Sequence, residues 1–152
     1  MATEHDSDST RRAHKAASRM MEECYGFRVR LLNRAVTSVY DEALRPHGLT
    51  CAQFNLLVAI EAVGERATPS NLARGMRIGK STLTRDVDRM VERGWVARAS
   101  LDDQRSHRLE LTAAGRALLL DTVPSWEGAQ GRMHRLLGDS QSQALHRMGR
   151  QL

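Results

Sequence analysis

Short hydroxyl side chains and arginines share one face of the helix predicted over residues 80–93. Leu83, Val87 and Met90 recur at i, i+4 and i+7, which gives this helix a single apolar face. The opposite face is predicted to contact DNA through Ser81, Thr82, Thr84, Arg85 and Arg89. Short hydroxyls let a helix approach phosphates and base edges, and an arginine can bind guanine with two hydrogen bonds. The alternative is that Ser81 only caps the helix and Arg85 only faces solvent.

A hairpin with a basic tip is predicted directly after this helix. Residues 95–99 and 107–111 are strand-like and flank the polar turn 102–105. A wing that enters the minor groove needs an arginine at its tip, and Asp103 is placed to orient Arg105 there. A plain turn also favours an aspartate at this position. Arg98 and Arg108, on the flanking strands, are expected to add charge to one face and to contact phosphate.

The elements that position these side chains form a winged helix-turn-helix pattern. A first short helix over residues 69–76 is joined to the second by the turn 77–79. The second helix of such a unit lies in the DNA major groove, and the hairpin reaches the neighbouring groove. The predicted fold class is therefore mainly α (α+β), with a winged helix-turn-helix DNA-binding lobe over residues 48–112.

Residues 18–47 and 113–152 carry helical apolar stripes that a small lobe does not need to cover. Pro46 should end the first of these helices, and Pro124 should start a new segment or kink the last. We predict that these segments form a dimerisation domain with a second copy of the chain. A monomer with a bundle of terminal helices is the alternative.

Residues 1–17 are polar and charged, so a flexible N-terminal tail is expected. Arg11, Arg12 and Lys15 could contact DNA as a basic arm or simply be solvated.

Length and charge narrow the class of protein without deciding it. A chain of 152 residues suits one domain, and a formal net charge of +5 favours a polyanionic partner. Basicity alone fits an RNA binder or a membrane-surface protein equally well. No apolar run has the length of a membrane span, and the N-terminus has no apolar signal core. We therefore expect a cytoplasmic protein with no membrane partner.

Three runs of residues together resemble the MarR family of winged-helix regulators. They are residues 48–54, residues 80–85 through 93–96, and residues 103–105 through 109–115. The resemblance extends over roughly residues 20–152. Two positions depart from the family pattern: Trp95 replaces a smaller aliphatic residue, and Gln104 replaces a charged one. The resemblance implies a homodimer on a palindromic operator, with regulation by a small molecule or by thiol oxidation.

The two cysteines are the candidate redox sensors. Cys51 lies at a helix start, where the helix dipole can lower a thiol's pKa. Cys24 lies on the first helix, in the region where some family members sense peroxide. The alternative is that both are small apolar core residues. The reducing cytosol opposes a permanent disulfide.

The family resemblance also implies an effector pocket between the dimerisation helices and each lobe. Such pockets take small aromatic or lipophilic molecules. The candidate lining residues are Phe27, Arg30, Arg34, Tyr40, Phe54 and Trp126. The same residues also fit ordinary core and surface positions.

Motifs of enzymes are missing from the sequence. It has no glycine-rich phosphate loop, His-Glu-x-x-His, nucleophile elbow or Cys-x-x-Cys, and its six histidines are scattered. We expect no catalysis, metal site or cofactor. The sequence predicts a homodimeric, sequence-specific DNA-binding transcription regulator, a repressor released from a pseudo-palindromic operator by a ligand or thiol oxidation. The alternative is an architectural DNA-binding protein without an effector.

Overall fold

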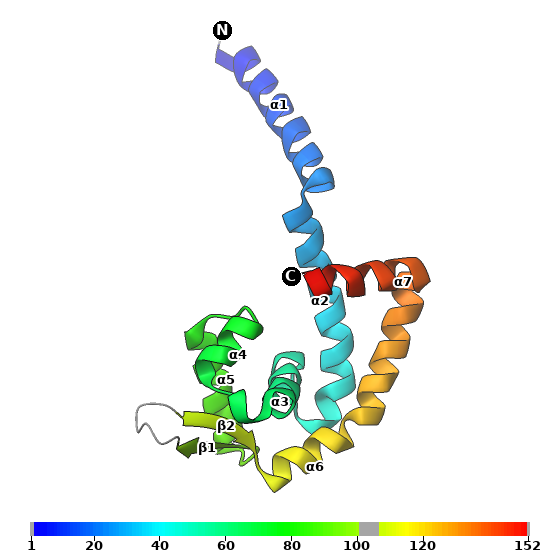
Figure 1. The fold of residues 1–152 in the computed structure, drawn as a ribbon. Helices are drawn as coiled ribbons and strands as arrows, with labels where there is room; N and C mark the ends of the chain where they lie inside the picture. The colour runs from blue at the N-terminus through cyan, green and yellow to red at the C-terminus, as the bar shows by residue number, and fades with distance from the viewer. Residues whose placement is uncertain (1, 101–106, 152) are drawn as a thin grey trace. The chain divides into compact units, whose positions relative to one another are not determined.

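The computed structural model describes residues 2–100 and 107–151, with side chains from Ser7 onward (Figure 1). The chain divides into two units, Met1–Ser38 and Val39–Leu152. Among the described residues, no helix combines the length and the apolar character needed to cross a membrane.

The unit Val39–Leu152 contains the predicted winged helix-turn-helix. The elements that lead into and form this lobe are, in chain order, η1 (Arg45–His47), α3 (Cys51–Val63), η2 (Gly64–Arg66), α4 (Pro69–Gly75), α5 (Lys80–Glu92), β1 (Val96–Ser100) and β2 (His107–Leu111). Thr50 is the N-cap of α3, because its hydroxyl accepts from the Gln53 N–H at 3.3 Å and the Gln53 side chain accepts from the Thr50 N–H at 3.1 Å. Thr68 caps α4 in a similar way, with Pro69 in the first turn.

The core of this lobe lies between α3, α4, α5 and the hairpin. Leu83, Val87 and Met90 are buried, so the predicted apolar face of α5 is confirmed. They belong to one cluster with Leu72 and Ala73 of α4, and with buried residues of α3, β1 and β2. Burial of this face holds α5 in place and leaves its other side exposed.

The hairpin β1–β2 is antiparallel, with Val96 opposite Leu111 and Arg98 opposite Leu109. Its register is reinforced from outside, since the Leu109 N–H donates to the Ala67 carbonyl at 2.9 Å. Leu109 and Leu111 are buried against the lobe.

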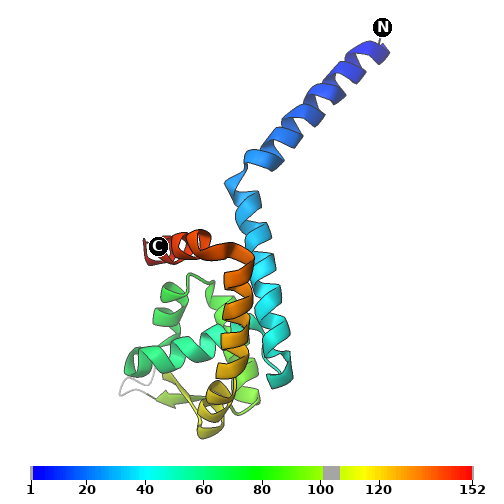
Figure 2. The ribbon, with the colours of Figure 1, turned by 90° about the vertical axis from the view of Figure 1, so that its right-hand side faces the viewer.

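Helices α6 (Ala113–Asp121) and α7 (Val123–Gln151) follow the hairpin. Thr112 caps α6 by accepting from the Gly115 N–H at 3.0 Å. Only glycine fits at position 115, because an added Cβ would collide with the Trp95 carbonyl. The predicted new segment at Pro124 is confirmed, and α7 changes direction at Gly138, where φ is 74° (Figure 2).

The unit Met1–Ser38 corrects the prediction of a flexible tail over residues 1–17. Residues 2–17 lie in helix α1 (Ala2–Glu23). Asp8 binds Arg11 at 2.9 Å and Arg12 at 3.3 Å, and Arg19 binds Glu23 at 3.1 Å. Ion pairs at these spacings support a helix locally, which a count of apolar residues does not detect.

A second correction concerns the helix expected to run without interruption from residue 18 to Pro46. It breaks at Cys24, and α2 (Tyr25–Leu44) begins directly afterwards. The Arg28 guanidinium spans the break by donating to the Glu22 carbonyl at 3.1 and 3.2 Å. Gly26 follows the break, and glycine lowers helix propensity.

Candidate nucleic-acid interface

The outer face of α5, defined by Ser81, Thr82, Thr84, Arg85 and Arg89, is exposed over its whole length. Gly79 is the N-cap of this helix, so Ser81 is not its cap. Thr84 differs from the two hydroxyls before it, because its Oγ1 donates to the Lys80 carbonyl at 2.9 Å. The Thr84 hydroxyl proton is therefore used within the helix, whereas Ser81 and Thr82 are better placed to approach DNA.

Arg85 and Arg89 lie one helical turn apart and are both exposed. Within residues 7–100 and 107–151, the structure gives neither guanidinium a carboxylate partner. Two guanidinium groups at this spacing, neither of them neutralised by a described carboxylate, can bind phosphate or the edge of a guanine.

Two further exposed cations at the start of α5 were not among the predicted contacts. Arg77 lies in the turn between α4 and α5 with φ of 53°, a left-handed conformation that is uncommon for residues other than glycine. Lys80 is the first residue of α5. The sequence signal that could have identified both residues is their position just before and at the start of the second helix, because helix N-termini bind anions.

The hairpin arginines are engaged differently from those of α5. Arg98 Nη2 donates to Asp88 Oδ1 on α5. Arg108 forms ion pairs with Glu65 and, at 3.3 Å, with Glu110. The expectation that both arginines charge one face is wrong: Arg98 is paired with Leu109, so Arg108, the next residue, lies on the opposite face of the hairpin. Asp103 and Arg105, predicted at the wing tip, lie outside the described residues.

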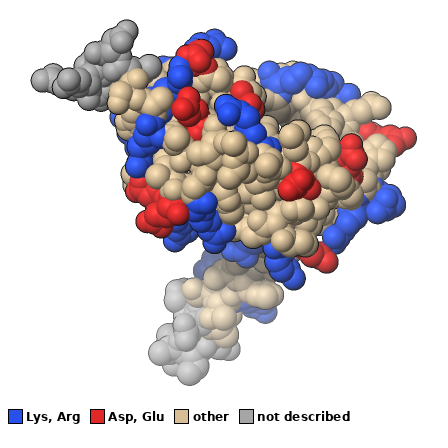
Figure 3. Space-filling view, turned by 90° about the horizontal axis from the view of Figure 1, so that it is seen from below, with Lys and Arg blue, Asp and Glu red and all other residues tan. Residues whose placement is uncertain are grey.

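Charge is dispersed on the face of the molecule seen in Figure 3. Lys and Arg side chains occur there around an uncharged central area, with Asp and Glu between them. Net charge alone therefore does not mark a binding surface on this face, and the local pairing of each arginine carries more information.

The structure also corrects the prediction for Cys51. Its pKa is raised, first by burial and then by the Asp41 carboxylate, while the Asn55 amide acts in the opposite direction. Asp41 Oδ1 accepts from the Cys51 N–H at 2.6 Å, which brings a negative charge beside the thiol. Desolvation and repulsion thus outweigh the helix dipole and disfavour the thiolate form of Cys51.

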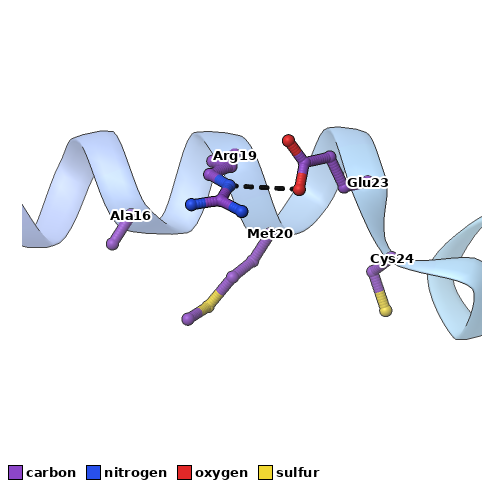
Figure 4. A pocket seen from close by; sticks show the side chains of 5 residues that line it. All are labelled: Ala16, Arg19, Met20, Glu23 and Cys24. Carbon is purple, nitrogen blue, oxygen red and sulfur yellow. Dashed lines mark hydrogen bonds and ion pairs between the residues drawn. The ribbon is translucent and has the colours of Figure 1, made fainter.

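Cys24 differs from Cys51 because its side chain is exposed, at the break between α1 and α2. It lines an open pocket with Ala16, Arg19, Met20 and Glu23, shown in Figure 4. In that view Met20 and Cys24 point to the same side of the chain, and Arg19 and Glu23 bind each other.

An apolar cavity of about 330 Å³ lies within the unit Val39–Leu152. Its lining comprises Phe54, Asn55, Val58, Leu119, Thr122, Val123 and Trp126. Two of the six predicted effector-pocket residues, Phe54 and Trp126, line it. Tyr40 instead donates its hydroxyl to Gln130, and burial followed by Cys51 raises the Tyr40 pKa. The other three, Phe27, Arg30 and Arg34, belong to the unit Met1–Ser38.

Within the described part of the chain, no cluster of three His, Cys, Asp or Glu residues could hold a metal ion. The arrangement offers an exposed polar and cationic helix face beside a hairpin, together with a separate apolar cavity.

Comparison with known proteins agrees with this arrangement. A family model described as the MarR family matches residues 47–106. The multiple antibiotic resistance protein MarR of Escherichia coli strain K12 is 32% identical over 91 residues, which cover 59% of this chain and 62% of that protein. The match therefore spans less than two thirds of this curated relative.

Solved structures match over more of the chain. The M. tuberculosis transcriptional regulator MosR in complex with DNA has a TM-score of 0.73 and 36% identity, covering 84% of this chain and 95% of that one. A mutant MarR from E. coli complexed with operator DNA has a TM-score of 0.77 and 25% identity, covering 87% and 96%.

Proposed function

Because this chain belongs to the MarR family, we propose that it is a homodimeric, sequence-specific DNA-binding regulator of transcription that acts as a repressor. The observation that carries the proposal is the outer face of α5, where exposed hydroxyls and two arginines without a described carboxylate partner lie opposite a buried apolar face. The DNA complexes of MosR and MarR support it, because both proteins resemble this chain over most of its length.

In the proposed complex, α5 lies in the major groove with its N-terminal half toward the base edges. Ser81 and Thr82 allow close approach, and Arg85 donates to a guanine. Arg89, one turn later, binds phosphate and fixes the orientation of the helix. The wing-tip residues Asp103 and Arg105 extend the contact into the minor groove, with the carboxylate orienting the guanidinium.

The proposed dimer accounts for apolar side chains that each unit leaves exposed. On α7 these include Leu136 and Met148, and in the other unit Met20, Tyr25 and Val29. A second copy would remove these side chains from water. Two lobes related by a two-fold axis then read half-sites about 10 base pairs apart.

Selection from a random duplex library with the full chain tests the proposal. We expect enrichment of one pseudo-palindromic sequence whose half-sites are separated by about one helical turn. Light scattering of the protein in solution should give the mass of a dimer. Uniform recovery of all sequences would refute sequence-specific binding and favour an architectural DNA-binding protein.

For release from the operator, we propose a small aromatic or lipophilic effector in the apolar cavity. The lining is mostly apolar, and Asn55 and Thr122 supply polar groups that could orient a ligand. The cavity lies between α3 on one side and α6 and α7 on the other, so a ligand there contacts both the lobe and a helix with exposed apolar side chains.

Trp126 provides a direct readout of binding in this cavity. In a Trp95→Phe background, which leaves one tryptophan, anilinonaphthalene sulfonate should quench Trp126 fluorescence. Val58→Phe, which fills the cavity, should abolish the quenching, and Leu120→Phe on the exposed surface nearby should not. Quenching that survives Val58→Phe would place the probe elsewhere.

Thiol oxidation is the competing release mechanism, and Cys24 is the better-placed candidate for it, since Cys24 is exposed whereas Cys51 is half-buried with a raised pKa. Under this mechanism, mild peroxide releases the selected DNA, a reductant restores binding, and Cys24→Ser abolishes the response. Release that persists in Cys24→Ser would leave the cavity ligand as the explanation.

A further inference from the structure

An ion pair joins the two elements of the candidate interface, α5 and the hairpin. Arg98 on β1 donates from Nη2 to Asp88 Oδ1 on α5, and the two side chains are 40% and 48% exposed. Arg98 lies opposite Leu109, whose side chain is buried, so it occupies the face of the hairpin turned toward the lobe. The guanidinium therefore reaches α5 from the inner face, beside the surface proposed to meet DNA.

Asp88 is an unusual residue for that position. It directly precedes Arg89 on a helix proposed to lie among phosphates, where a carboxylate is repelled. An aspartate can accept a hydrogen bond from cytosine, but one oxygen of Asp88 is already bound to Arg98. Its observed partner is a cation that could otherwise bind phosphate.

We propose that Asp88 limits the sequence-independent affinity of this protein for DNA: it holds the Arg98 guanidinium away from DNA phosphates and so weakens binding to DNA of every sequence. The proposal rests on the proposed DNA-binding function. Phosphate neutralisation supplies most of the sequence-independent attraction between a protein and DNA. Removing one cation from the phosphate contacts weakens all complexes alike and leaves discrimination between sequences to the outer face of α5.

A purely structural role for the pair makes the opposite prediction. Ion pairs between exposed side chains contribute little to stability, so the pair is a weak brace. If it were needed to position the hairpin, its loss would weaken binding to operator and random DNA alike. Masking predicts tighter binding to random DNA, so the sign of the change separates the two roles.

The test measures affinity of the full-length protein for a random-sequence duplex and for the selected duplex across a range of salt concentrations. Asp88→Asn should bind the random duplex on the order of threefold more tightly or better. Its plot of log affinity against log salt should be steeper by about 0.9 for each protomer, the value for one added phosphate contact. Affinity for the selected duplex should rise by a similar factor, so the ratio of selected to random affinity should change little.

Three further variants isolate the masking effect. Asp86→Asn makes the same charge change on the same helix, at a residue with no ion pair in the described part of the chain, and should steepen the salt dependence less. Arg98→Gln combined with Asp88→Asn should return the slope to the wild-type value. Asp88→Glu keeps the carboxylate and should behave as wild type.

Every other outcome overturns the proposal. Weaker binding of Asp88→Asn to both duplexes, with an unchanged unfolding temperature, would assign the pair a bracing role. Loss on the selected duplex alone would make Asp88 a base contact. An unchanged slope would show that Arg98 is not masked. A wild-type protein that binds no duplex would instead refute the proposed function itself, which the first titration reveals.

Discussion

The outer face of α5 and the strands of the hairpin both carry arginines, but the two regions differ in whether carboxylates bind those arginines. Arg85 and Arg89 are exposed and have no carboxylate partner among the described residues, whereas Arg98 and Arg108 each bind acidic side chains. All four are arginines close to the same predicted interface. The charge that a protein offers to DNA therefore depends on which carboxylates the fold brings beside each guanidinium, and not on the number of arginines.

The largest effect expected on α5 comes from its inner face. Leu83→Ala removes a side chain that is 1% exposed and should lower the free energy of unfolding by about 2 to 5 kcal/mol, measured by urea denaturation. DNA binding should then decline only as the unfolded fraction rises. Loss of binding without loss of stability would mean that the two faces of α5 are not separate in function.

On the outer face, Arg85→Ala should weaken binding to the selected duplex by about 1 to 3 kcal/mol and relax preference at one position of each half-site. The free energy of unfolding should change by no more than about 0.5 kcal/mol, because the side chain is exposed. Equal losses on selected and random duplexes would reduce Arg85 to a phosphate contact.

At the wing tip, which lies outside the described residues, Arg105→Ala should cost about 1 kcal/mol on sites with A·T-rich flanks and less on other sites. Asp103→Ala should produce part of the same loss by releasing the arginine. A double-mutant cycle measures their coupling, and strictly additive losses would show that the residues act independently.

The smallest effect is expected on β2. Arg108 is 22% exposed and bound to Glu65 and Glu110, so Arg108→Gln should leave affinity for the selected duplex within about threefold of wild type. The free energy of unfolding of Arg108→Gln should fall by no more than about 1 kcal/mol, since Glu65 is largely exposed. A loss of DNA affinity as large as that of Arg85→Ala would remove the distinction between the two regions.

The sequence was sufficient to predict α5 and the hairpin, because each depends on local spacing. The starts of α3 and α6 are equally local, since each depends on one capping side chain. Leu83, Val87 and Met90 predict a buried helix face without knowledge of what covers it. Thr50 and Thr112 predict helix starts because capping joins residues only three apart.

The pairing of the arginines was not predictable in the same way. Arg98 and Asp88 meet because β1 packs on α5, and Arg108 meets Glu65 across 43 positions of sequence. Placing Arg98 and Arg108 on one face failed for a specific reason: in an antiparallel pair, a register shift of one residue moves a side chain to the other face. The turn 102–105 alone did not determine that register.

Amide chemical-shift changes on addition of the selected duplex show whether the outer face of α5 reads DNA. We expect saturating shifts for residues 81–89 and smaller shifts for β2, recorded on the full-length labelled protein at moderate salt. A random duplex of equal length should produce weaker changes that disappear as salt is raised. Large shifts in β2 or α7 with α5 unaffected by the selected duplex would mean that another surface of the protein reads DNA.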